Sequence, residues 1–206
     1  MDAIRDALLI IDLQPDFMPG GPLAVVGGDE LAAPIAAYAQ QFATVIATQD
    51  WHPAGHASFA STQGKPPFSR MDLHGVSHTL WPDHCVQGTA GARLHAALPE
   101  AGLTMILRKG AHTEVDSYSA FRENVGPGGA RASTGLAAFL RARGVERLWL
   151  CGIARDVCVA WSAIDAAKEG FQVTLVDRLT RAVDPSDAAR AITDAALANA
   201  GVTIER

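Results

Sequence analysis

The alternation of short apolar runs with Ala-rich segments constrains the fold of this chain more than any other feature. The six apolar runs occupy residues 7–12, 43–50, 103–109, 147–153, 171–177 and 202–205. Their apolar residues are mostly continuous, which is typical of parallel strands covered on both faces. The segments at 30–42, 134–143, 156–170 and 185–201 read as helices. The pattern predicts an α/β fold, a three-layer α/β/α arrangement around a six-stranded, mostly parallel sheet.

Turn residues delimit the predicted helices. Three glycines stand where helices commonly end in a residue of positive φ: Gly144, Gly170 and Gly201. Asp184 and Pro185 predict the cap and first turn of the last helix.

Composition limits the class of protein. The chain has 206 residues, is 49% hydrophobic and has a formal net charge of −5, which suits one globular domain over residues 1–206. The charge gives no reason to expect a nucleic-acid partner, and no apolar segment approaches the roughly 20 residues that span a bilayer. The first residues lack the order of a signal peptide, so a cytoplasmic location is expected. The sequence leaves open whether the chain forms a homo-oligomer.

Residues from about 51 to 91 depart from the strand–helix alternation. This stretch has little periodicity and many Pro, Gly, His and Trp residues. A long segment of this kind inside a compact domain is usually functional or disordered, and its aromatic and histidine content favours function. We interpret it as an insertion that binds substrate and metal.

Polar or reactive groups follow four of the predicted strands. They are Asp12, Asp50, Lys109 and the turn that leads from Gly152 to Cys158. Ligands of open α/β sheets bind beyond the carboxyl ends of the strands, so these groups are expected to share one site. Taken singly, Asp12 reads as a turn acid and Lys109 as a solvated base. The prediction depends on their joint placement.

The three cysteines have different surroundings. Cys158 lies near the start of a helix beginning at about Asp156, where free amides and the helix dipole stabilise a thiolate or bind an oxyanion. Ordinary helix packing is the alternative. Cys151 lies within an apolar strand, where burial would leave its thiol inert, and Cys85 is also expected to be structural. A nucleophilic Cys158 would need a base and a cation, which Asp12 and Lys109 could supply.

A second set of candidates lies in "QDWHPAGH" (49–56) and "WPDHC" (81–85). Asp50 and His52 are two residues apart and would point the same way in an extended segment. His84 could complete a three-ligand metal site, with His56 as a fourth ligand or a neighbour. Loop histidines bonded to the backbone are the alternative.

Five stretches in order along the chain carry a specific resemblance. They are residues 8–25, 47–60, 79–95, 108–121 and 151–166, and they include an Asp-Trp-His and a Trp-Pro-x-His-Cys element. Together they resemble the isochorismatase-like cysteine hydrolases, and within that superfamily the nicotinamidases. The resemblance implies hydrolysis of nicotinamide to nicotinate and ammonia through a Cys158 thioester, in NAD salvage, with pyrazinamide as a further substrate.

The resemblance also implies roles for residues. Asp12, Lys109 and Cys158 match the catalytic triad. Asp50, His52 and His84 match ligands of one divalent metal ion, usually zinc, with iron or manganese as alternatives. The remaining matches are an oxyanion hole at Ala154 and Cys158 after a cis Ile153–Ala154 bond, and a substrate-binding set of Phe17, Trp81, Tyr118 and Gln14.

Two positions differ from the pattern of the resemblance. The family often has Thr or a small residue where this chain has Arg155, and an aromatic residue or His where it has Val157. Neither position carries the chemistry, but both could change the shape of the pocket and the amide preference.

Three other functions are compatible with parts of the sequence. A superfamily amidase acting on ureido or carbamoyl compounds would keep the triad without needing the metal cluster. A non-catalytic binding module would have an unreactive Cys158. A Rossmann-type oxidoreductase is disfavoured, because "IDLQPDF" stands where a Gly-x-Gly-x-x-Gly turn would follow the first strand.

Overall fold

A six-stranded sheet forms the centre of the computed structural model, which describes all residues from 1 to 206. The strands are β1 (Asp6–Ile11), β2 (Thr44–Asp50), β5 (Met105–Lys109), β6 (Arg147–Ile153), β7 (Gln172–Arg181) and β8 (Thr203–Glu205). Their order is β5-β2-β1-β6-β7-β8, and every neighbouring pair is parallel. The predicted sheet is therefore confirmed, and it is parallel throughout.

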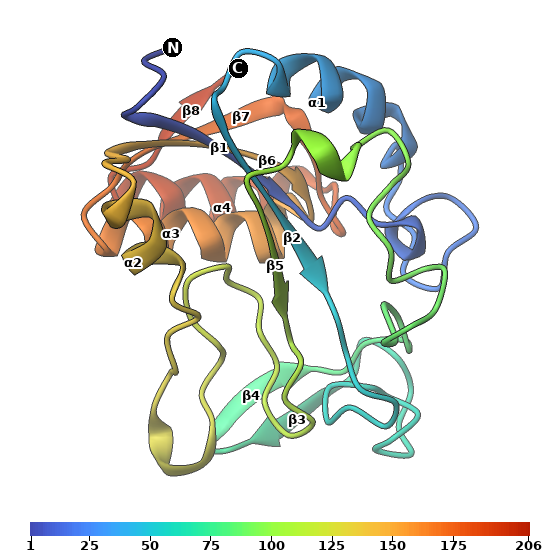
Figure 1. The fold of residues 1–206 in the computed structure, drawn as a ribbon. Coiled ribbons are helices and arrows are strands. Elements are labelled where there is room, and N and C mark those ends of the chain that lie inside the picture. The colour runs from blue at the N-terminus through green and yellow to red at the C-terminus, as the bar shows by residue number, and fades with distance from the viewer.

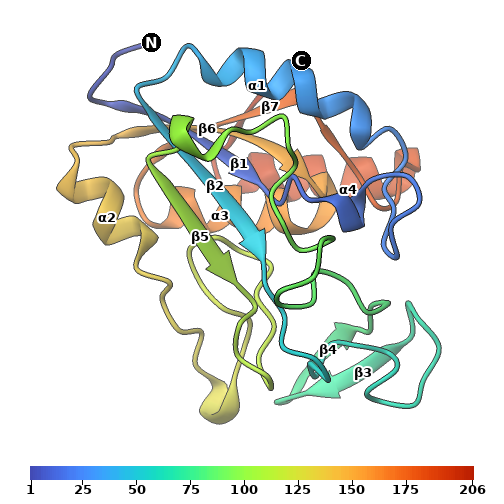
Figure 2. The same cartoon turned by 45° about the vertical axis from the view of Figure 1, so that its right-hand side comes forward.

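Helices cover both faces of the sheet (Figures 1 and 2). They are α1 (Ala32–Ala39), α2 (Leu136–Ala142), α3 (Ala160–Lys168) and α4 (Asp187–Asn199). Successive β1 residues point to opposite faces, so Leu8 packs in the core cluster with α1 while Leu9 packs in the cluster with α2, α3 and α4. The result is the predicted three-layer α/β/α fold.

The structure corrects the predicted start of α4. Ser186, rather than Asp184, is the N-cap: its extended backbone turns into the helix and its hydroxyl accepts a hydrogen bond from the Ala189 N–H at 3.2 Å. Asp184 instead accepts from the Ser186 N–H, two residues before the cap position. The three predicted terminal glycines do have positive φ values.

Two strand predictions also change. β7 continues to Arg181, four residues beyond the apolar run, because Leu179 and Thr180 are buried although charged residues flank them. The stretch without periodicity contains a short antiparallel hairpin, β3 (Arg70–Leu73) and β4 (Val76–Thr79). Figure 1 shows this hairpin beyond the carboxyl ends of β2 and β5.

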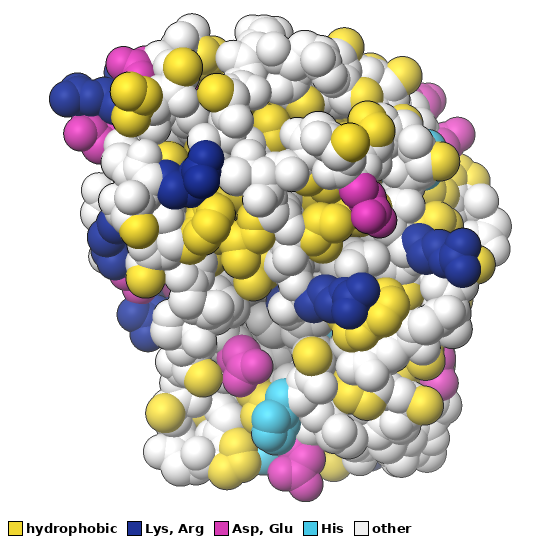
Figure 3. Space-filling model, in the orientation of Figure 1, with side chains coloured by type: hydrophobic (Ala, Val, Ile, Leu, Met, Phe, Trp, Pro, Cys, Tyr) yellow, Lys and Arg dark blue, Asp and Glu magenta, His cyan; other side chains and the backbone are white.

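Surface charge is dispersed on the face drawn in Figure 3, where Lys and Arg side chains lie apart from one another among acidic and hydrophobic ones. None of the helices is both long enough and apolar enough to cross a bilayer.

Candidate active site

The carboxyl ends of three neighbouring strands bring two carboxylates and an ammonium group together. Asp12 follows β1, Asp50 ends β2 and Lys109 ends β5, and all three residues are at least 96% buried. Lys109 Nζ lies 2.8 Å from Asp12 Oδ2 and also pairs with Asp50 Oδ1. Although burial favours the neutral amine, the two carboxylates hold the pKa of Lys109 well above its usual value. The lysine is therefore a fixed cation between two acids.

Cys158 adjoins this charged cluster. It lies in a π-helical turn, Arg155–Val159, that joins β6 to α3, and its Sγ is 3.5 Å from Lys109 Nζ. Sγ and one carboxylate oxygen each of Asp12 and Asp50 all lie within 4.8 Å of one another. The geometry places a sulfur, an acid and a cation in the relation that nucleophilic catalysis needs.

The protonation of Cys158 differs from the expectation of a dipole-stabilised thiolate. Burial raises the pKa of the Cys158 thiol well above its ordinary value, and the Asp12 and Asp50 charges add to this effect against the attraction of Lys109. Burial therefore favours the protonated thiol, and a base would have to remove this proton before the sulfur could act as a nucleophile.

Asp12 has the properties of that base. Burial raises its pKa to about 6, against the stabilising charge of Lys109 and a 2.6 Å hydrogen bond from the Thr48 hydroxyl. A carboxylate with a pKa near 6 is ionised at neutral pH yet accepts a proton more readily than an ordinary aspartate. The sequence pattern did not identify Thr48, because a threonine inside a strand carries no signal of its own.

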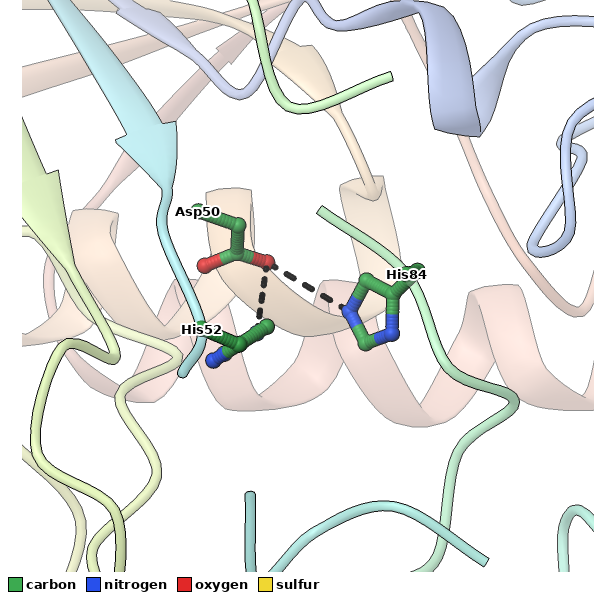
Figure 4. A group of neighbouring side chains, drawn as sticks. All are labelled: Asp50, His52 and His84. Carbon is green, nitrogen blue, oxygen red and sulfur yellow. Dashed lines mark ion pairs between the residues drawn. The ribbon is translucent and has the colours of Figure 1, made fainter. Parts of the chain in front are cut away.

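Asp50, His52 and His84 form a second cluster beside the first (Figure 4). The Nε2 atoms of both histidines lie 3.7 Å from Asp50 Oδ2. The opposite ring nitrogens, Nδ1, are held by backbone carbonyls: the carbonyl of Gly110 at 2.9 Å for His52 and that of Pro82 at 2.8 Å for His84. Backbone contacts of this kind orient metal-binding histidines, so the donor set fits a divalent metal ion.

His56 lies next to this cluster without joining it. Its Nδ1 is 2.7 Å from the Ser58 hydroxyl and its Nε2 is 3.4 Å from the Val115 carbonyl. Both ring nitrogens therefore have protein partners. Asp116, which the sequence pattern did not single out, lies with His52 and His56 in a further group of close donor atoms.

One pocket opens onto both clusters. Its walls are Phe17, Leu23, Asp50, His52, Trp81, His84, Asp116, Tyr118, Ala154, Val157, Cys158 and Val183. Three predicted substrate contacts, Phe17, Trp81 and Tyr118, are among them, and the Trp81 Nε1–H donates to the Tyr118 hydroxyl at 3.1 Å. A small aromatic molecule would be surrounded by these rings while its edge met the polar groups.

Gln14 is not part of the pocket wall, in contrast to its predicted place among the substrate contacts. Its side chain is fully buried and bonds to the backbone of Asp50: its Nε2 donates to the Asp50 carbonyl at 2.9 Å, and its Oε1 accepts from the Asp50 N–H at 2.8 Å. Gln14 thus holds the end of β2 in place. Since both polar atoms of its amide are bonded to the Asp50 backbone, the amide does not face a ligand.

The turn after β6 presents a free backbone donor. The Ile153–Ala154 peptide bond is cis, as the resemblance implied, and Ala154 lines the pocket. The Ala154 carbonyl accepts from the N–H groups of Val157 and Val159, whereas the Ala154 N–H donates to no protein group. An unpaired N–H beside a sulfur nucleophile suits the binding of an oxyanion.

The two other cysteines lie outside the pocket wall. Cys151 is fully buried within β6, and burial raises the pKa of its thiol far above the ordinary range. Burial also raises the pKa of Cys85 well above its usual value. No disulfide links the three cysteines.

Comparison with known protein families matches residues 6–205 to the isochorismatase domain. The chain belongs to the isochorismatase family. Within this family it is 46% identical to a nicotinamidase of Acinetobacter baylyi, over 86% of this chain and 82% of that protein. It is 41% identical to a nicotinamidase of Escherichia coli, over 94% and 92% of the two chains.

Solved structures of family members superpose on most of the chain. An Acinetobacter baumannii nicotinamidase/pyrazinamidase is 38% identical, with a TM-score of 0.93, covering 100% of this chain and 98% of that one. A Pyrococcus horikoshii pyrazinamidase in complex with zinc is 33% identical, with a TM-score of 0.78 over 98% and 99%. A yeast nicotinamidase bound to the inhibitor nicotinaldehyde is 27% identical, with a TM-score of 0.90 over 97% and 98%.

Proposed function

We propose that this member of the isochorismatase family hydrolyses nicotinamide to nicotinate and ammonia through a thioester on Cys158. The observation that carries the proposal is that Cys158 and a free Ala154 N–H line an aromatic pocket, with Asp12 and Lys109 buried beside the sulfur. Relatives named as nicotinamidases support the choice of nicotinamide as substrate. Pyrazinamide, which has a similar flat ring and carboxamide, is proposed as a second substrate, and recycling of NAD as the physiological setting.

Substrate binding would use both halves of the pocket. The pyridine ring would lie against Phe17 and Trp81, with Tyr118 closing the same wall, while the carboxamide carbon reaches Cys158. We also assign the segment from about 51 to 91 as a substrate- and metal-binding insertion within a single domain, since it supplies Trp81 as well as two histidine ligands.

Asp50, His52 and His84 would hold one divalent metal ion, with zinc proposed first and iron or manganese as alternatives. The zinc complex of the P. horikoshii relative supports a metal in this family. When bound, such an ion would act as a Lewis acid that attracts the pyridine nitrogen and orients the ring. Asp50 suits this role, because Lys109 and His52 hold its pKa well below the usual range in spite of its burial.

The first half of the reaction forms the thioester. Asp12 takes the Sγ proton, and the sulfur attacks the carboxamide carbon while the C=O π electrons move onto oxygen. The resulting oxyanion would accept hydrogen bonds from the Ala154 and Cys158 N–H groups. Preorganised donors of this kind are worth about 3–4 kcal/mol each in other acyl-transfer sites. When the C–N bond breaks, Asp12 returns its proton to the leaving nitrogen, and ammonia departs.

The second half releases the acid. Asp12, ionised again, accepts a proton from a water molecule that attacks the thioester carbon. The C–S bond then breaks, the proton passes from Asp12 to the sulfur, and the carboxylic acid loses its remaining proton to solvent and leaves as nicotinate. Lys109 remains charged throughout and stabilises the ionised forms of Asp12 and of the sulfur.

The proposal is tested by measuring ammonia release from nicotinamide with metal-reconstituted protein, beside a Cys158→Ala control. We expect turnover by the natural chain and none by the variant. A panel with pyrazinamide and with ureido and carbamoyl compounds tests the substrate class. Turnover of the ureido compounds alone, independent of metal, would contradict the proposal.

A further inference from the structure

We infer that Arg155 is a positioning residue, one that fixes the turn bearing the Ala154 N–H and so the donor for the oxyanion. The inference rests on the proposed function. Arg155 is one of the two positions at which this chain differs from the residues common in the family it resembles. It immediately follows Ala154, the residue that presents the free N–H.

Arg155 is an unusual arginine because only 3% of its surface is exposed. Its Nε lies 2.7 Å from Asp177 Oδ1 on β7, and one terminal nitrogen lies 2.6 Å from Asp194 Oδ1 on α4. A buried guanidinium requires such partners, since an unpaired charge in the interior is strongly unfavourable. The side chain therefore joins the π-helical turn to a strand and a helix that are distant in sequence.

Each carboxylate has a second arginine on its outer side. Asp177 Oδ2 is 2.5 Å from Arg190, and Asp194 Oδ2 is 3.1 Å from Arg206. Removal of the Arg155 charge would therefore leave neither acid without a partner. The arrangement makes Arg155 dispensable for charge balance, while its side chain restrains the turn.

The other restraints on Ala154 act on its carbonyl, which accepts from the N–H groups of Val157 and Val159, and on the strand that precedes it. On its strand side, Gly152 packs so closely that a Cβ would lie 2.1 Å from the Ile11 carbonyl oxygen, which fixes the chain one residue before the end of β6. After that point, the Ala154 N–H has no protein partner. The Arg155 ion pairs are thus the nearest side-chain anchor on the helix side of this N–H.

Asp156, the next residue, also anchors the turn. The Asp156 carboxylate accepts hydrogen bonds from the N–H groups of Val183 and Asp184, both at 2.9 Å. Val183 lines the substrate pocket. Arg155 and Asp156 therefore tie the π-helical turn to β7, to α4 and to the connection between them.

A residue that positions an oxyanion donor should affect the transition state more than the bound ground state. Loss of one such donor outright lowers kcat by about 10²–10³-fold in other enzymes. Because Arg155→Met would loosen the Ala154 N–H without removing it, we expect kcat to fall about 10-fold to 100-fold, below that full loss. We expect KM for nicotinamide to change by less than about twofold.

Two inhibitors separate this role from a general change of pocket shape. Nicotinaldehyde reacts with the nucleophile: the Cys158 sulfur bonds to the aldehyde carbon, the C=O π electrons move to oxygen, and the thiol proton passes to Asp12. Its oxyanion needs the same donor as the transition state. Nicotinate forms no such bond. In Arg155→Met, the inhibition constant of nicotinaldehyde should rise by about the factor lost in kcat/KM, and that of nicotinate should stay within about twofold.

The variants are Arg155→Met, Arg155→Lys and the control Arg178→Met. Lysine keeps the positive charge but does not reproduce both guanidinium contacts, to Asp177 and to Asp194. Arg155→Lys should therefore recover part of the kcat that Arg155→Met loses. Arg178 follows Asp177 on β7 but pairs with Glu205 and stacks on Tyr38, with no hydrogen bond to the turn, so its loss should leave all four constants unchanged. If Arg155→Met melts below the assay temperature, Asp194→Asn replaces it and should show the same split to a smaller extent.

Equal losses of nicotinaldehyde and nicotinate affinity would overturn the inference, as would an unchanged kcat in folded Arg155→Met or, where it serves as replacement, in Asp194→Asn. These results would leave the proposed function intact if the natural chain releases ammonia. Failure of the natural chain to hydrolyse nicotinamide would overturn the proposed function, and the inference with it.

Discussion

Asp12 follows β1, Asp50 ends the neighbouring strand β2, and both pair with Lys109. Their pKa values nevertheless shift in opposite directions. Burial raises the pKa of Asp12 to about 6, whereas Lys109 and His52 hold that of Asp50 well below its usual range. The two acids mark two halves of the site. We call Asp12, Lys109 and Cys158 the nucleophile half, and Asp50, His52 and His84 the histidine half.

The difference shows how one sheet edge supports two kinds of chemistry. Asp12 has one cation and one hydroxyl as partners, so desolvation dominates and the group exchanges a proton readily. Asp50 has the same cation on one oxygen and two histidines, His52 and His84, near the other, so its charged form is favoured. The first environment suits a base and the second a metal ligand.

The sharpest test of the nucleophile half is Cys158→Ala. We expect ammonia release to fall by more than about 10⁴-fold, because the attacking atom is lost, while nicotinate binding measured by calorimetry persists. Cys151→Ala is the matched control, a thiol of the same chain buried in β6. It should retain near-normal kcat and lose about 1 kcal/mol of unfolding free energy through a small cavity. Inactivity of a folded Cys151→Ala protein would reverse the assignment of the two thiols.

Asp12→Asn removes the base and should lower kcat by about 10²–10⁴-fold. In the natural chain, Asp12 must be ionised to accept the sulfur proton, and its pKa is raised to about 6. The value of kcat/KM should therefore be level above this pH and fall about tenfold for each pH unit below it. A pH profile of both proteins measures this, and persistence of the acid limb in Asp12→Asn would assign it to another group.

Disruption of the histidine half should have a smaller effect on chemistry than on binding. We expect His84→Ala, or removal of the metal by a chelator, to lower kcat/KM by at least about tenfold, mainly through weaker ring binding. Metal content by mass spectrometry and the nicotinate dissociation constant are the measurements. Unchanged binding and turnover in metal-free protein would show that the nucleophile half works alone.

Among these variants, Thr48→Val should change activity least. It should alter only the pKa of Asp12, and so the difference in pKa between Asp12 and Asp50. It removes the 2.6 Å hydrogen bond to Asp12 with little change of volume. A hydrogen bond worth about 1 kcal/mol corresponds to about 0.7 pKa unit, so the acid limb of kcat/KM should move to higher pH by up to that amount. The plateau rate above that limb should change little. A shift to lower pH would contradict the place of Thr48 in setting the acidity of Asp12.

The sequence predicted the parts of the site that follow from strand ends. Continuous apolar runs specify buried parallel strands, and Asp12, Asp50 and Lys109 stand at their carboxyl ends, where a parallel sheet gathers them at one edge. The spacing of Asp50 and His52 likewise gave their common direction, because an extended chain repeats every two residues.

Other features depended on three-dimensional surroundings. The resemblance put Gln14 in the substrate-binding set, but the fold directs its amide to the backbone of Asp50. Thr48 and Asp116 belong to no motif and reach the site only through the packing of β1 against β2 and of a long loop against His52. The N-cap at Ser186 was decided by which oxygen reaches a free N–H, and it lies two residues after the predicted cap at Asp184.

By itself, therefore, the sequence determined the layered fold, the strand-end grouping of Asp12, Lys109 and Cys158, and the Asp50–His52 pair, because each follows from a local period or from the rule that parallel strands end together. Only the tertiary structure decided the direction in which the pKa values of Asp12 and Cys158 shift and the anchoring of Arg155 by Asp177 and Asp194. Acidity depends on desolvation and on charges brought from remote segments. The residues next to a group in the sequence determine neither its desolvation nor the charges that surround it.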